Sequence, residues 1–206
     1  MQIAAGRIVQ DIKRQRIVGG VIQIERDHRG QRLLSAHKHQ LCPVPKGEYA
    51  KEQHMIRSNH TDRLFNVIMN KIPAFMSLPE LKFEKFMKLD ELGITYHKKP
   101  YAVAKGLIAV HGDEGSVKPT PGLTALESAR RAGISTICGH THRAGFSQFS
   151  ESSGGKISRI IKGYEGGHLM DTRLATYTRG QMNWQQAFII VEEDLKGSQV
   201  SVINLE

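Results

Sequence analysis

The stretch GISTICGHTH, residues 133–142, decides the fold of this 206-residue chain. Its apolar run Ile134–Cys138 predicts a buried strand, and the glycine that follows lets the chain turn. His140 and His142 then stand two residues apart at the strand end, where both rings can enter one cavity. Neutral imidazoles held in this way bind Zn, Mn, Fe or Ni. Because an H-x-H pair alone is also typical of an exposed loop, the interpretation depends on the motifs that accompany it.

Two earlier motifs share this setting. Residues 58–60 (Ser-Asn-His) follow a short apolar segment, and residues 111–112 (His-Gly) follow an apolar strand. Polar residues at the ends of several strands meet at one edge of a sheet, where α/β folds place their sites. An asparagine oxygen and imidazole nitrogens at such an edge would form a nitrogen and oxygen metal cluster.

The hydrophobic pattern predicts alternating helices and strands. A helix capped by Asp62 should end at Pro73, and a second helix should run from Pro79 to Gly93. Further strands surround one more helix, which is typical of a mixed α/β layered domain. The expected segments are a strand over 101–110, a helix over 124–131 and strands over 134–138, 146–149, 157–161, 187–191 and 200–205.

Composition narrows the class of protein. The net charge is +9, from 29 Lys and Arg against 20 Asp and Glu. Residues 1–57 hold 11 of the basic and 5 of the acidic residues, and residues 58–206 hold the other 18 and 15. This excess favours a phosphorylated partner such as nucleic acid, or else a solvated basic surface. No apolar run of about 18 residues predicts a membrane span. Cys42 and Cys138 form neither a disulfide framework nor a CxxC zinc site, so we expect a reducing compartment, the cytoplasm.

In their order, the motifs resemble the second half of the calcineurin-like metallophosphoesterase family, which reads G-N-H-[DE], then H-G, then G-H-x-H. The resemblance covers residues 55–206, leaving 1–54 as an atypical basic segment. Residues 165–169 (EGGHL) and 183–186 (NWQQ) resemble phage-type members, which would place the chain in a host cytoplasm. The resemblance implies a layered α/β/β/α sandwich of the metallophosphoesterase type that lacks or alters its first strands.

The resemblance also implies roles for particular residues. Divalent Mn, Zn or Fe would be bound, as a pair of ions in the family, to hydrolyse a phosphodiester or phosphomonoester by activated water. His60 would be the general acid that faces the leaving group. The implied metal ligands are Asn59, His111 and His140 for the second metal and His142 for the first, with Asn59 and Arg63 contacting substrate.

The chain departs from the family pattern in two places. Ser58 replaces the family glycine, and Thr61 replaces the acid that orients the catalytic histidine, although Asp62 stands next to it. Upstream, the family supplies D-x-H and a bridging G-D, but no D-x-H precedes residue 59. Asp11 lies where D-x-H is expected, but Lys13 takes the place of its histidine. Asp27 is a candidate bridging ligand, and the candidate substitutes for the histidine ligands are His37 and His39.

Two interpretations of function therefore stay open. The first is a metal-dependent phosphoesterase with a mononuclear or weakened site, acting on a phosphoester such as nucleic acid or a nucleotide. The second is a catalytically incomplete remnant, or half of a split phosphoesterase, which binds nucleic acid or a partner chain. Missing first strands would leave an open sheet edge, which favours a second chain or self-association. We also expect His168, at a glycine-rich turn, to be exposed and Trp184 to be a packing anchor.

Overall fold

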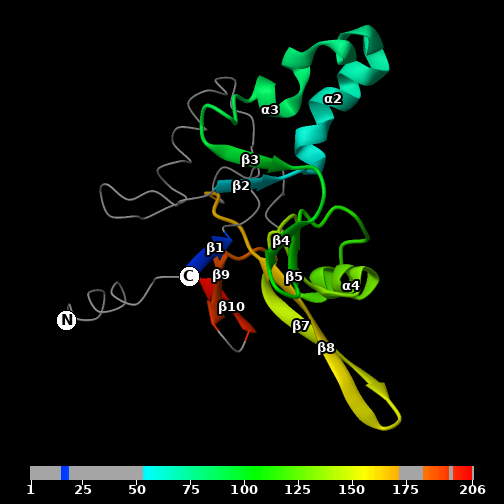
Figure 1. Ribbon diagram of the computed structural model, residues 1–206, viewed down its shortest axis with the longest axis vertical. Helices are drawn as coiled ribbons and strands as arrows, with labels where there is room; N and C mark the ends of the chain where they lie inside the picture. Colours follow the sequence, from blue (N-terminus) through cyan, green and yellow to red (C-terminus); the bar gives the residue numbers. More distant parts are fainter. Residues whose placement is uncertain (1–14, 19–52, 172–182, 195–196, 206) are drawn as a thin grey trace, which may run out of the picture.

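A five-stranded mixed sheet lies at the centre of the structure, a computed structural model that describes residues 15–18, 53–171, 183–194 and 197–205 (Figure 1). In sheet order its strands are β4 (Tyr101–Ala104), β5 (Leu107–Val110), β6 (Ser135–Cys138), β8 (Lys156–Gly166) and β7 (Ala144–Ser153). The central three strands are parallel, and the two edge strands run antiparallel to their neighbours. Because β5 and β6 are parallel neighbours, the residues that follow them emerge at the same edge.

A second sheet covers one face of the first. Its order is β1 (Gln15–Val18), β9 (Ala187–Asp194) and β10 (Gly197–Asn204), all antiparallel. Alternate apolar residues of the two sheets meet in the main core, as expected for facing sheets. The buried members of this core are Val103, Leu107, Ala109, Ile137, Tyr164, Ile189 and Val191.

Helix α4 (Leu123–Ala132) covers the opposite face of the five-stranded sheet. Its buried residues pack against the side chains of β5, β6 and β8 that point away from the second sheet. The helix approaches β8 closely at Gly163, where an added Cβ would lie 2.0 Å from the backbone nitrogen of Leu126. The described layers are therefore helix, sheet and sheet. These layers confirm a mixed α/β fold.

The segment before the sheet is mainly helical and extends to one end of the molecule (Figure 1). It connects β2 (Gln53–Ile56) to its parallel neighbour β3 (Ile94–His97). Within it lie α2 (Asn59–Lys71), η1 (Pro73–Ser77), η2 (Pro79–Leu81) and α3 (Phe83–Phe86). We call residues 59–92 the helical arm. Between residues 62 and 88, no side chain that the structure describes is buried.

Most predicted elements are confirmed, and three need correction. The expected helix over 124–131 and the five later strands are present. The strand expected over 101–110 is instead the β4–β5 hairpin, which turns at Gly106 with φ of 77°. The helix expected from Pro79 to Gly93 is broken into η2 and α3, because its apolar residues have little core to pack against. Helix α2 is capped by Ser58 rather than Asp62.

No helix among the described residues is long and apolar enough to cross a membrane. The division into residues 1–54 and 55–206 stays a prediction, as does self-association through a sheet edge. The candidate ligands Asp11, Asp27, His37 and His39 lie outside the described residues.

Candidate metal centre

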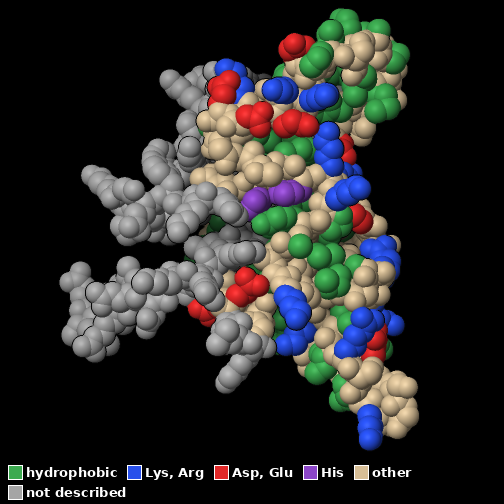
Figure 2. Space-filling model, viewed as in Figure 1, with side chains coloured by type: hydrophobic (Ala, Val, Ile, Leu, Met, Phe, Trp, Pro, Cys, Tyr) green, Lys and Arg blue, Asp and Glu red, His purple; other side chains and the backbone are tan. Residues whose placement is uncertain are grey.

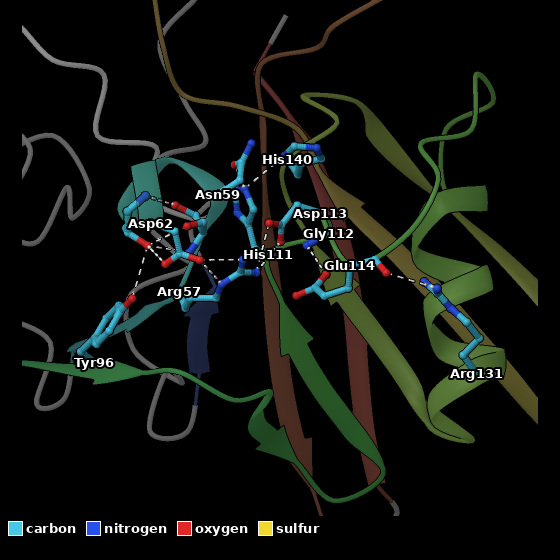
Figure 3. A network of polar contacts seen from close by, with 12 residues as sticks. Arg57, Asn59, Asp62, Tyr96, His111, Gly112, Asp113, Glu114, Arg131 and His140 are labelled. Carbon is cyan, nitrogen blue, oxygen red and sulfur yellow. Dashed lines mark hydrogen bonds and ion pairs between the residues drawn. The ribbon is translucent and has the colours of Figure 1, made fainter. Parts of the chain in front are cut away.

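Three side chains from separate parts of the chain bring their donor atoms together (Figure 3). Nε2 of His111 lies 3.0 Å from Oδ1 of Asn59 and 3.1 Å from Nδ1 of His140. Asn59 begins α2, His111 follows β5 and His140 follows β6. The sequence prediction that these three motifs converge is therefore confirmed in its geometry, although Asn59 arrives from the separate two-stranded sheet.

The spacing of these atoms fits a bound cation. Two ligands held about 2.1 Å from one metal ion lie about 3.0 Å apart in octahedral and about 3.4 Å apart in tetrahedral geometry. Without an ion, the single proton or single lone pair on His111 Nε2 would have to serve two polar neighbours at once. The outer ring nitrogen of His111 is buried and has no hydrogen-bond partner among the described residues, whereas metal-ligating histidines usually donate from that atom. The spacing of the donor atoms of Asn59, His111 and His140 thus fits a bound cation. The missing hydrogen bond to the outer nitrogen of His111 does not fit the usual environment of a metal ligand.

Burial keeps the ring of His111 neutral. Its pKa is lowered to about 3, first by burial and then by the charges of His140 and His60. The pKa of His142 is lowered to about 4 by burial, with smaller effects from His168, His140 and His60. The general-acid role of His60 stays a prediction. Neutral rings keep the nitrogen lone pairs that a metal needs.

The H-x-H loop has an unusual backbone. His140 and His142 both have positive φ, of 58° and 60°, which is uncommon for residues with a side chain. The loop is fixed at its start by a hydrogen bond from the Gly139 amide to the carbonyl of His111, 3.1 Å long. Such strained positions cluster at functional sites and persist only when the surrounding structure holds them.

Trp184 and His168 surround His142, although they lie far from it in the sequence. The Trp184 ring contacts the His142 ring edge-on with centroids 4.4 Å apart, and the His168 ring lies 5.8 Å from it. The backbone of Gln185 links the two histidines by accepting from His168 N–H and donating to the His142 carbonyl. The two tail stretches therefore wrap the H-x-H loop. The prediction that His168 is exposed is wrong, because it is 6% exposed beneath these contacts.

Arg57 links the helix that carries Asn59 to the loop that carries His111. Its guanidinium donates to Asp62 at 2.8 Å and to both carboxylate oxygens of Asp113 at 3.0 and 3.1 Å (Figure 3). Asp62 lies in the first turn of the helix that carries Asn59, and Asp113 lies two residues after His111. No sequence motif marks Arg57, because one of its partners is 56 positions away.

Ser58 and Thr61 act together at the start of α2. The Ser58 hydroxyl accepts from the Thr61 amide at 3.1 Å, and the Thr61 hydroxyl accepts from the Ser58 amide at 2.9 Å. This reciprocal pair is a capping box, which satisfies two backbone donors at the start of α2. Asp62, the acidic residue next to Thr61, is engaged by Arg57. Arg63 is exposed on α2, and its substrate contact stays a prediction.

Carboxylates near the centre are committed to other partners. Asp113 pairs with Arg57, and a carboxylate oxygen of Glu114 accepts from the Gly112 amide at 2.9 Å. Among the described residues, no group of three or more His, Cys, Asp or Glu side chains is placed to hold a metal ion. The centre seen here is therefore two histidines and one asparagine, and a bridging carboxylate is not found in this part of the chain.

Comparison with known proteins gives two relatives and no matching family model. The chain is 35% identical over 140 residues to the Gene 54 protein of Mycobacterium phage D29. It is 31% identical over 140 residues to the Gene 54 protein of Mycobacterium phage L5. Each alignment covers 66% of this chain and 54% of the relative. The chain thus spans about half the length of these relatives, and its predicted similarity to phage proteins is supported.

Proposed function

We propose that this protein is a metal-dependent phosphoesterase of the calcineurin-like metallophosphoesterase type, with the corresponding α/β/β/α sandwich. The observation that carries the proposal is that His111 Nε2 lies 3.0 Å from Asn59 Oδ1 and 3.1 Å from His140 Nδ1. A single divalent ion, Mn, Zn or Fe, suits this neutral donor set. His142 would add a ligand only if a second ion is bound nearby.

The residues of this chain would divide the work of phosphoester hydrolysis. A bound divalent ion would polarise the phosphoryl group and activate a water molecule. Water attack forms one phosphorus–oxygen bond and breaks the bond to the leaving oxygen, which needs a proton. His60 would hold that proton, and Asn59 and the exposed Arg63 would orient the phosphate oxygens. The net charge of +9 favours a polyanion such as nucleic acid, or a nucleotide, as the substrate class.

A matched pair of variants tests the metal assignment. His140→Ala should lower the Mn or Zn that copurifies with the protein, measured by ICP-MS. His97→Ala is the control, because His97 lies on β3 and contacts His54 at 3.0 Å rather than the centre. Equal metal content in wild type and His140→Ala would refute the ligand assignment.

A second candidate function is favoured by the engaged carboxylates around the centre. With Asp113 and Glu114 committed elsewhere, two adjacent dications would repel with little to offset them. The chain would then be a catalytically incomplete half that binds nucleic acid or a partner chain. Hydrolysis of bis-p-nitrophenyl phosphate with Mn²⁺ separates the two candidates. Robust turnover that His60→Ala abolishes would reject the incomplete half, whereas metal binding without turnover would support it.

A further inference from the structure

Thr141, the middle residue of the H-x-H motif, is anchored inside the protein. It is 5% exposed, and its hydroxyl donates to Oε2 of Glu165 at 2.7 Å. The same hydroxyl accepts from the Arg143 amide at 3.3 Å. Thr141 therefore ties the loop between the two histidines to a residue on β8, 24 positions away.

The carboxyl group of Glu165 joins three elements of the fold. Glu165 is fully buried on β8 and pairs in register with Cys138, the last residue of β6. Its second oxygen accepts from the Thr124 amide at 3.0 Å, in the first turn of α4. The positive end of the helix and the Thr141 hydroxyl thus both stabilise a buried acidic group.

The loop needs such an anchor because its two histidines have left-handed backbone conformations. Positive φ at His140 and His142 costs free energy that the surroundings must supply. Thr141 stands between the two strained residues, so fixing it restricts both neighbours. A capping role for Glu165 at α4 would explain the bond to Thr124, but it leaves the bond to Thr141 unexplained.

We propose that Glu165 is a positioning residue of the metal centre, which acts through Thr141 to hold His140 and His142 in their left-handed conformations. The expected effect of Glu165 on metal binding rests on the proposed function. The expected effect of Glu165 on the positions of the two histidines does not. The acidic residue of the EGG stretch thereby gains a role that the sequence alone did not suggest.

The decisive comparison is Thr141→Val against Thr141→Ser. Valine removes the hydroxyl at similar size and leaves the bond between Glu165 and Thr124 in place, whereas serine keeps the hydroxyl. Mn²⁺ affinity, measured by titration calorimetry, should fall about 10-fold or more in Thr141→Val and stay within about 2-fold of wild type in Thr141→Ser. Leu126→Ala, in the core between α4 and β8, controls for stability loss that leaves the loop bond intact.

A double-variant cycle links the effect to Glu165. Glu165→Gln keeps an acceptor for the Thr124 amide but replaces one carboxylate oxygen with an amide group. It should weaken Mn²⁺ binding as Thr141→Val does, and the double variant should lose little more because both remove one interaction. If the double variant lost Mn²⁺ affinity by the product of the two single losses, the two residues would act separately, and the proposal would be overturned.

NMR of the histidine rings tests the positioning role of Glu165 separately from metal binding. If wild type binds no Mn²⁺, the metal centre fails, and the imidazole resonances of metal-free protein decide the positioning role. Shifted resonances of His140 and His142 in Thr141→Val, restored in Thr141→Ser, would support it. Unchanged resonances, or equal Mn²⁺ affinity in wild type and Thr141→Val, would overturn it.

Discussion

The helical arm and the five-stranded sheet contribute to the same centre, but they are packed very differently. The part of the sheet next to the centre is covered on both faces, and strands β5 and β6 bury apolar residues in the described core clusters. Large apolar side chains of this sheet stay exposed only on β7 and β8, as at Phe146 and Ile157 among the described residues. The arm leaves large apolar side chains such as Met69, Phe75 and Phe86 about half exposed. Hydrophobic side chains gather on the surface at the end of the molecule where the arm lies (Figure 2). His111 and His140 therefore stand on a rigid support, whereas Asn59 and His60 stand on a loosely packed one.

This difference makes Arg57 the connection that matters for the shape of the centre. Helix α2 has few buried contacts of its own, so the position of Asn59 depends on its first turn. That turn is held by the Ser58 cap and by the ion pair between Arg57 and Asp62. Because Arg57 also binds Asp113, it fixes the start of the arm to the loop that carries His111.

Low pH should cause the largest loss of stability, and it should act on the histidines that follow the strands of the five-stranded sheet. The pKa of His111 is lowered to about 3 and that of His142 to about 4, against an ordinary value near 6.5. Below pH 6.5 the unfolded chain takes up these protons while the folded chain does not, so stability is lost as the pH falls from 7 to 4. The free energy of unfolding in EDTA should drop by on the order of 1 kcal/mol per histidine for each pH unit.

His111→Gln isolates the contribution of one ring. Urea titrations of this variant between pH 4 and pH 6 should show a dependence of stability on pH that is smaller by about one proton. A variant with the wild-type slope would show that His111 titrates normally in the folded protein.

Core variants should separate the two regions next. Ile137→Ala removes a buried side chain from the five-stranded sheet and should lower the free energy of unfolding by about 2–5 kcal/mol. Met69→Ala, in the arm, should change it by less than about 0.5 kcal/mol because the side chain is 52% exposed. Both values come from urea denaturation followed by circular dichroism. Similar losses in the two variants would mean that the arm is packed more tightly than its exposure indicates.

Breaking the connection between the regions should weaken both stability and metal binding. Arg57→Gln leaves the carboxylates of Asp62 and Asp113 without their cation, at a cost of about 1–2 kcal/mol, since the Arg57 side chain is 32% exposed and screened by water. Mn²⁺ affinity should fall about 10-fold, because Asn59 is no longer held against His111.

Lys85→Gln is the matched control for this loss of charge. Lys85 also lies in the arm and pairs with Asp90 at 3.8 Å, but both side chains are mostly exposed. Calorimetric titration should give wild-type affinity for it. Equal weakening in both variants would point to net charge rather than to the connection.

The sequence predicts the sheet side well because its signals are local and strong. Apolar runs of four or five residues ending in His-Gly or Gly-His mark β5 and β6, and parallel pairing then brings His111 and His140 together. What the sequence does not reveal depends on contacts between distant residues. His168 is buried beside Trp184 and His142, which are distant in the sequence. Arg57 becomes important only when folding places Asp113 beside it.

The arm was harder to predict for a different physical reason. The apolar spacing after Pro79 suggests a helix with a buried stripe, but a stripe stabilises a helix only when another surface covers it. Here Phe86 is 51% exposed, and only Leu89 of the expected stripe is buried, so the segment forms short turns instead. The predicted start of α2 at Asp62 is wrong because Ser58 and Asp62 are both favoured N-cap residues, and only the capping box between Ser58 and Thr61 decides between them.

The smallest expected effect tests that joint cap. Ser58→Ala removes the hydroxyl that accepts from the Thr61 amide and should lower the free energy of unfolding by about 1 kcal/mol. Thr61→Val should cost a similar amount, since it removes the acceptor for the Ser58 amide. If the two act as one capping box, urea denaturation of the double variant should show less than the sum of the single losses. Strictly additive losses would mean that Ser58 and Thr61 stabilise the start of the arm independently, so that the two hydrogen bonds would be separate caps rather than one capping box.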